Sequence, residues 1–238
     1  MLRQHPEKKR VRLIALIATY PFAVKLLCQY VPGRAFEGII GIWVFFVYLL
    51  CTKGKGNEYG LCMPKKAPHS FIPALLLILP NLFCLGELVG AGIRLRESLA
   101  LLIGSVVWEE IVFRGLLLNG LLKRYPHGLA VIMQGILFGI MHLVNLETYA
   151  SLSYAIVQMI VAAGAGVWLG AIAWDSGSIW WGVLFHTAIN CSAMLAEQSG
   201  IELGVTMLQG LVDLTAAVVC MISGVSIAKK ADTKVRMV

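Results

Sequence analysis

Three groups of polar residues stand out because each lies in an otherwise apolar stretch and has the spacing of one helical turn. They are Glu109 and Glu110 with Arg114, Phe138 with His142, and His186 with Asn190. Side chains four residues apart share one face of a helix, so each group presents its members together. Ionisable groups at membrane depth are costly, and a membrane protein that keeps several of them generally uses them for chemistry or transport.

The first group predicts one paired carboxylate and one free carboxylate. Glu110 and Arg114 are four residues apart and are expected to form an ion pair. Glu109 points about 100° away around the helix, so it remains free of that arginine. Three central charges cost about 7 to 10 kcal/mol to insert, and the apolar residues of the same helix return only about 4 to 8 kcal/mol. The helix therefore needs neighbouring helices that stabilise its charges. The alternative interpretation is that all three charged residues serve only as structural contacts between helices.

The composition identifies the kind of protein that must position these groups. Of the 238 residues, 58% are hydrophobic and only 14% are charged, which is typical of a polytopic helical membrane protein. The sequence predicts an all-α bundle of about eight transmembrane helices in a single integral membrane domain, residues 1–238. The predicted spans are residues 11–30, 36–52, 71–92, 98–122, 128–144, 150–174, 178–197 and 203–228.

The net charge of +7 reflects the orientation of the chain in the membrane. Eight spans with a cytoplasmic N-terminus place fifteen basic residues on the side of the two termini and three, Arg34, Arg94 and Arg96, on the other. This imbalance satisfies the positive-inside rule with both termini in the cytoplasm. A nucleic-acid partner is not expected, because no soluble element carries a basic face with interleaved aromatic residues.

Two further segments have structural interpretations. The small residues Ala162, Ala163, Gly164, Ala165, Gly166 and Gly170 predict close contact between helices, not a nucleotide-binding loop. Residues 53–70 are rich in Lys, Gly and Pro and are interpreted as a cytoplasmic connector.

The three motifs, taken together, resemble those of a known family. Glu-Glu-x-x-x-Arg at 109–114, Phe-x-x-x-His at 138–142 and His-x-x-x-Asn at 186–190 follow one another on successive predicted helices. This order is similar to that of the CPBP (Abi) family of intramembrane glutamic proteases, which includes type II CAAX prenyl endopeptidases and bacteriocin-processing members. The resembling region, about residues 98–197, would be the catalytic core.

The resemblance implies a role for each motif residue. Glu109 and His142 would activate a water molecule, while His186 and Asn190 would hold the oxyanion of the attacked peptide bond. Glu110 and Arg114 would orient Glu109, and Phe138 would shape the pocket wall. The implied activity is that of an intramembrane endopeptidase, which cuts near the C-terminus of a lipidated (CAAX-like) or membrane-anchored protein substrate. A carboxylate desolvated in a membrane gains proton affinity, which suits this role as a general base.

Several alternatives remain open at this point. Two histidines and a glutamate match the ligand count of a catalytic zinc site, so Glu109, His142 and His186 are candidate metal ligands of a metalloprotease, although no cofactor is the preferred expectation. A non-proteolytic immunity or regulatory protein of the same fold is the second functional reading, and a proton-coupled transporter is the third. We expect a multi-pass protein of a prokaryotic plasma membrane.

Overall fold

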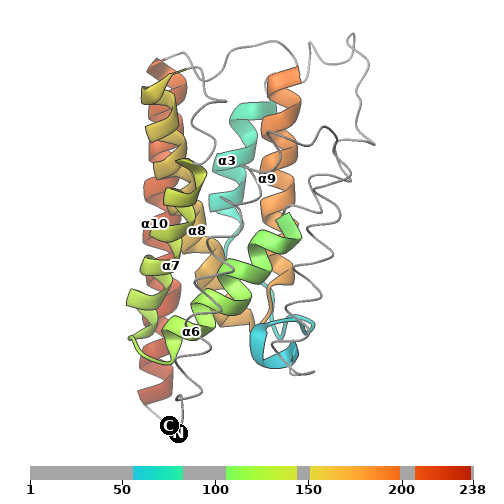
Figure 1. The fold of residues 1–238 in the computed structure, drawn as a ribbon, viewed down its shortest axis with the longest axis vertical. Helices are drawn as coiled ribbons and strands as arrows, with labels where there is room; N and C mark the ends of the chain where they lie inside the picture. The colour runs from blue at the N-terminus through green and yellow to red at the C-terminus, as the bar shows by residue number, and fades with distance from the viewer. Residues whose placement is uncertain (1–55, 83–105, 144–150, 199–206, 237–238) are drawn as a thin grey trace, which may run out of the picture.

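The long apolar runs of the sequence form helices in the described part of the chain. The computed structural model describes residues 56–82, 106–143, 151–198 and 207–236, so the predicted spans 11–30 and 36–52 lie outside these ranges. All regular elements in the described ranges are helical, and the main helices lie alongside one another (Figure 1). The predicted all-α class is therefore confirmed for these residues.

The helices follow the predicted spans closely where both can be compared. In chain order they are η1 (Gly56–Tyr59), α3 (Ile72–Leu82), a helix from residue 106 that includes η2 (Ile111–Leu117) and α6 (Leu118–Leu122), α7 (His127–Met141), α8 (Leu152–Ser176), α9 (Trp180–Gln198) and α10 (Met207–Arg236). Among the described residues, two helices are long and apolar enough to cross a membrane: α8, and α10 over Gly210–Lys230. The total of eight spans stays a prediction.

Small residues bring three helices into contact at the level of their backbones. A Cβ atom added to Gly139 of α7 would lie 2.5 Å from the carbonyl oxygen of Met159 in α8. A Cβ atom added to Gly164 of α8 would lie 2.6 Å from the carbonyl oxygen of Ala217 in α10. Such distances leave no room for a side chain, so the predicted role of the small residues at 162–170 in close helix contact is confirmed.

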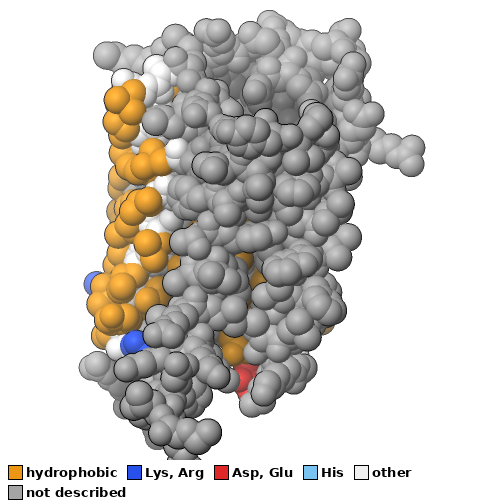
Figure 2. All heavy atoms as spheres, viewed as in Figure 1, with side chains coloured by type: hydrophobic (Ala, Val, Ile, Leu, Met, Phe, Trp, Pro, Cys, Tyr) orange, Lys and Arg blue, Asp and Glu red, His pale blue; other side chains and the backbone are white. Residues whose placement is uncertain are grey.

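One side of the bundle exposes aliphatic side chains along its length. Figure 2 shows this apolar strip on the edge where α7, α8 and α10 lie. The exposed aliphatic residues of these three helices include Ile136, Leu137, Ile140, Ile156, Leu211, Val218 and Ile222. An extended apolar surface of this kind is unfavourable in water and suits contact with lipid chains.

The segment after η1 is more ordered than a simple connector. The backbone N–H of Lys65 donates to the carbonyl oxygen of Ser176 over 3.0 Å, and the N–H of Ile179 donates to that of Gly60 over 2.9 Å. The hydroxyl of Ser178 donates to the carbonyl oxygen of Cys62 over 2.6 Å. These bonds fix the segment against the turn between α8 and α9, which starts with Gly177 in the left-handed conformation (φ 69°). The segment thereby holds the beginning of α9, the helix that carries His186.

Candidate active site

The helix that carries the two glutamates changes its winding directly after them. Residues 106–110 are α-helical, whereas Ile111–Leu117 form a π-helix, a rare form that is frequent at functional sites. Asn119 follows this segment, and its amide group donates to the carbonyl oxygens of Arg114 (3.2 Å) and Gly115 (2.8 Å). The side chain of Asn119 thus pairs with carbonyl groups at the point where the chain returns to α-helical hydrogen bonding.

The predicted ion pair of Glu110 and Arg114 is confirmed. Glu110 Oε1 lies 3.1 Å from Arg114 Nη1, and both side chains are 0% exposed. The guanidinium carbon of Arg114 also lies 4.1 Å from the centre of the Phe138 ring, in a cation–π arrangement. A carboxylate and an aromatic face therefore compensate a charge that is completely removed from solvent.

His186 of α9 connects the two neighbouring glutamates. Its Nδ1 atom lies 3.0 Å from Glu110 Oε1, which is hydrogen-bond distance. Its Nε2 atom lies 3.7 Å from Glu109 Oε2, which is too long for a direct hydrogen bond. Each nitrogen of the ring therefore faces a different carboxylate, and the Glu110 contact fixes the orientation of the ring.

Gly182 makes the approach of α9 to Glu110 possible. It lies one turn before His186, and a Cβ atom at this position would collide with Oε2 of Glu110. Oε1 of the same carboxylate is held by Arg114 and His186, so the carboxylate has little freedom to move away.

Phe138 lies between the two histidines. The centre of its ring is 4.8 Å from that of His142 and 5.5 Å from that of His186, in both cases with an edge-on geometry. His142 Nδ1 lies 3.0 Å from the carbonyl oxygen of Phe138. Because a carbonyl oxygen only accepts, Nδ1 carries the proton in the neutral ring and Nε2 carries the lone pair. The His142 ring also lies within electrostatic range of Glu109.

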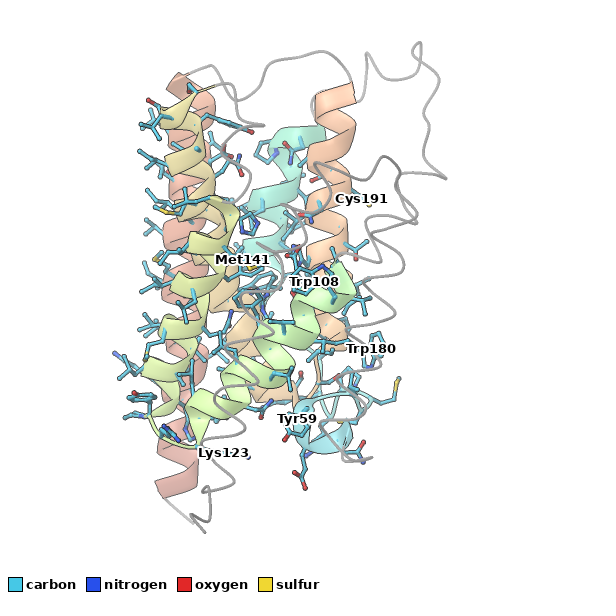
Figure 3. The ribbon with its side chains drawn as sticks, in the orientation of Figure 1. Tyr59, Trp108, Lys123, Met141, Trp180 and Cys191 are labelled. Carbon is cyan, nitrogen blue, oxygen red and sulfur yellow. The ribbon has the colours of Figure 1, made fainter. Side chains whose placement is uncertain are left out.

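The position of His142 at the end of α7 has a consequence for solvation. The fifteen residues of α7 give a length of about 22 Å, less than the hydrocarbon thickness of about 30 Å. Met141, its last residue, lies near mid-height in Figure 3, and it belongs to the hydrophobic cluster against which Trp108, the residue before Glu109, packs. A helix that ends at membrane depth requires polar or hydrated surroundings for its last carbonyl groups.

The structure brings six of the seven predicted site residues into one connected group. We call this group the polar cluster, and its members are Glu109, Glu110, Arg114, Phe138, His142 and His186. Asn190, the seventh, is half-buried one turn after His186 on α9.

The candidate zinc ligands Glu109, His142 and His186 all lie in the polar cluster. Within the described ranges, no three His, Cys, Asp or Glu side chains are grouped so that they could hold a metal ion. His142 and His186 each direct Nδ1 to a protein oxygen, that of Phe138 and that of Glu110. These contacts leave Nε2 of each ring as the nitrogen that could face another ligand.

Two residues that support the polar cluster were not predicted from the sequence. Gly182 precedes His186 by four residues, and Asn119 follows Arg114 by five. The helical spacing of Gly182 from a motif histidine could have identified it as a candidate. Asn119 carries no comparable signal, because its role depends on a π-helix that no residue pattern indicated.

Comparison with known proteins tests the resemblance drawn from the motifs. Neither a curated protein nor a solved structure matches the chain. A family model does match, over residues 92–192, and its description is "Type II CAAX prenyl endopeptidase Rce1-like". The matched residues include all three motifs and the helices that carry them, so the resemblance is confirmed at the level of the family. Residues 92–192 of this chain are thus similar to the Rce1-like family of type II CAAX prenyl endopeptidases.

Proposed function

We propose that this protein is an intramembrane endopeptidase that cuts a peptide bond near the C-terminus of a lipidated, CAAX-like, or membrane-anchored protein in a prokaryotic plasma membrane. The family supports a protease. The observation that carries the proposal is the position of His186 between two adjacent carboxylates, of which only Glu110 is paired with Arg114. Glu109 is thus a carboxylate beside an imidazole, without the arginine that neutralises its neighbour.

The gap between Glu109 and His186 suits the binding of the attacking water molecule. A distance of 3.7 Å between Oε2 and Nε2 allows one water oxygen to lie within hydrogen-bond distance of both atoms. Glu109 then takes a proton from the water as its oxygen attacks the carbonyl carbon of the peptide bond. His142 contacts the Phe138 carbonyl through Nδ1, so the lone pair of its Nε2 is available as a second acceptor for that proton.

The remaining steps balance the proton. The attacked carbonyl oxygen becomes an oxyanion, which the Asn190 amide and Nε2–H of His186 stabilise by donating hydrogen bonds. In this scheme His186 carries the Nε2 proton before the attack, so the same N–H donates first to the water and then to the oxyanion. When the C–N bond breaks, Glu109 passes its proton to the nitrogen of the leaving amine. The proton of the new carboxylic acid then passes to the same amine, so the products are a carboxylate and an ammonium group, and Glu109 is again a carboxylate. Glu110 and Arg114 do not exchange protons in this scheme; they keep His186 in place.

A cleavage assay tests this proposal. The purified protein is incubated with a fluorescence-quenched farnesylated peptide that ends in a CAAX sequence. Glu109→Gln removes the base but keeps the size of the side chain, so cleavage is expected to fall by at least about a hundredfold, the lower range for loss of a general base. Asp175→Asn is the matched control, because Asp175 is a carboxylate paired with Lys66 outside the polar cluster. Equal cleavage by wild type and Glu109→Gln would contradict the proposal.

The same assay tests the proposed independence from metal. Cleavage should be unchanged after treatment with a strong chelator and dialysis, because the proposed mechanism uses Glu109 as the base and needs no metal ion. Loss of cleavage on chelation, followed by recovery on addition of zinc, would reject the metal-free mechanism while leaving the endopeptidase activity intact.

A further inference from the structure

Gln134 is a buried polar side chain that no motif includes. It lies on α7 one turn before Phe138 and two turns before His142, so the three residues share one face of the helix. Gln134 is 0% exposed, and neither Nε2 nor Oε1 has a hydrogen-bond partner among the residues that the structure describes. Leaving both ends of a buried amide unpaired is unfavourable, so this residue needs a function or a bound partner.

The side chain of Gln134 lies against a glycine of the neighbouring helix α8. A Cβ atom added to Gly170 of α8 would collide with Oε1 of Gln134, and it would lie 3.8 Å from Cδ2 of Leu118. The carboxamide of Gln134 therefore occupies the space that a side chain at position 170 would fill. Leu118, which follows Arg114 by one turn, lies next to this space.

Arg114 has unpaired donors next to this position. Its Nε and Nη2 atoms are buried and have no hydrogen-bond partner in the described part of the chain. Arg114 lies over Phe138, and a Cβ atom on Gly166 would lie 3.1 Å from Cδ1 of the same ring. The level of Arg114, Phe138 and Gly166 thus lies next to a second level, formed by Leu118, Gln134 and Gly170. Leu118 and Gly170 lie four residues after Arg114 and Gly166, whereas Gln134 lies four residues before Phe138.

One helical turn is about 5.4 Å, close to the separation of two polar groups bridged by one water molecule. We propose that Gln134 and Arg114 together bind internal water, and that Gln134 is a positioning residue that acts through this water on Arg114. Water bound to the Gln134 amide would then contact one side of the Arg114 guanidinium, and Glu110 would contact the other side. Glu110 orients His186. Removal of the Gln134 amide would therefore disturb the position of the proposed catalytic groups, although Gln134 itself does not contact the substrate.

The first test examines the water site itself and does not depend on enzymatic activity. An experimental structure of the full chain in lipid, at a resolution that shows ordered water, should contain density within hydrogen-bond distance of both the Gln134 amide and the Arg114 guanidinium. Well-ordered side chains with no density between them, or with a direct Gln134–Arg114 hydrogen bond, would overturn the proposal.

The second test concerns the positioning role and rests on the proposed protease function. Gln134→Leu keeps the volume but removes the amide, whereas Gln134→Asn keeps the amide in a shorter side chain. If Gln134 acts through water, Gln134→Leu should lower kcat about tenfold with KM unchanged, and Gln134→Asn should retain most of the activity. A packing role predicts the reverse order, because Leu fills the space better than Asn.

Two further variants complete this test. Gly170→Ala should also lower kcat, because the added methyl group displaces the Gln134 carboxamide without removing a polar group. Gln158→Leu is the matched control, because Gln158 is a half-buried glutamine that donates to the Tyr154 hydroxyl at 3.0 Å on its own helix; its kcat should equal that of wild type. Equal activity of Gln134→Leu and wild type would overturn the positioning role. If wild type cleaves no substrate, the proposed function fails, and the density for water still decides the binding site.

Discussion

At the scale of single residues, one oxygen atom links the ion pair to the histidine. Glu110 Oε1 contacts both Arg114 Nη1 at 3.1 Å and His186 Nδ1 at 3.0 Å. A carboxylate that accepts from two cationic or polar donors is held more rigidly than one with a single partner. Glu110 therefore transmits the position of Arg114 to the imidazole ring, and the ring presents its other nitrogen to Glu109. Adjacent glutamates thus have separate roles, one in positioning and one in the proposed proton transfer.

Gly182 is the residue at which this arrangement is most sensitive to a small change. Gly182→Ala would place a methyl group on the second oxygen of Glu110, which cannot move freely because Arg114 and His186 hold the carboxylate. We expect kcat to fall at least about tenfold, as for the loss of a hydrogen bond to a charged group, with KM little changed. Steady-state cleavage of the farnesylated peptide measures both constants.

Gly210→Ala provides the control for this substitution. Gly210 lies in α10, and a Cβ atom there would meet nothing within 4 Å. Alanine is favoured over glycine in a helix interior by about 1 kcal/mol, so this variant should be as active as wild type and equally or more stable. Wild-type activity of Gly182→Ala would show that the close approach of α9 to Glu110 is not needed for catalysis.

At the scale of the elements, Arg114 lies within the π-helix of Ile111–Leu117. A change from π-helical to α-helical hydrogen bonding alters the pairing of the backbone carbonyls, and unpaired buried carbonyls are unfavourable. Asn119 compensates by donating to the carbonyls of Arg114 and Gly115. The sequence around Arg114 is therefore kept in a rare conformation by a side chain from the following turn.

Removal of the amide donor of Asn119 should weaken this segment. Asn119→Asp keeps the size of the side chain but replaces its NH2 group by an oxygen that repels the two carbonyls. We expect a loss of thermal stability equivalent to about 1 to 3 kcal/mol, together with a fall in kcat, because Arg114 is less well held. Asn57→Asp, at an exposed asparagine of η1, is the control and should change neither quantity. A stable and fully active Asn119→Asp variant would argue against this role.

The contrast between local and tertiary determinants explains what could be predicted from the sequence. The Glu110–Arg114 pair was predicted correctly because residues four apart on one helix meet regardless of their surroundings. The span at 150–174 closely matches α8, Leu152–Ser176, because hydrophobic length alone defines it.

Other features depend on how the helices are rotated against one another. Which nitrogen of His186 faces which glutamate follows from the orientation of α9, and the sequence contains no local signal for it. The π-helix and the docking of residues 60–65 on the turn after α8 were missed for the same reason, because distant contacts stabilise both. The roles of Glu109, His142, His186 and Asn190 in catalysis remain predictions.

At the scale of the whole molecule, the apolar strip and the polar cluster have opposite environments. The strip lies on the outside of the bundle, whereas the polar cluster lies inside it. Exposed aliphatic side chains on α7 and α10 face outward, as contact with lipid requires (Figure 2). On the inner side of α7, Phe138 and Gln134 are 2% and 0% exposed, and the Phe138 ring lies against the Arg114 guanidinium. This helix therefore separates lipid from the proposed hydrolytic site, and a substrate must reach that site by another face.

The described basic residues outside the helix interiors gather at one end of the bundle. Lys123 and Arg124 precede α7, and Lys229 and Lys230 lie in the last turns of α10. Lys65 lies near the end of α8, because its backbone N–H donates a hydrogen bond to Ser176, the last residue of that helix. In Figure 1 the start of α7 and the ends of α8 and α10 share the lower end, whereas the start of α8 lies at the upper end. The positive-inside rule predicts that the lower end is cytoplasmic, with both termini on that side.

Labelling of single cysteines tests this orientation. In a variant without the six native cysteines, Lys123→Cys should react with a membrane-impermeant maleimide only when the cytoplasmic face of vesicles is exposed. Ser151→Cys, at the start of α8, should react only from the opposite face, because the 25 residues of α8 are long enough to separate the two positions by the thickness of a membrane. Both should react after addition of detergent. Labelling of both from one face would show that α8 does not cross the membrane, and the exchanged pattern would show that the basic end faces outward and that the positive-inside rule fails for this chain.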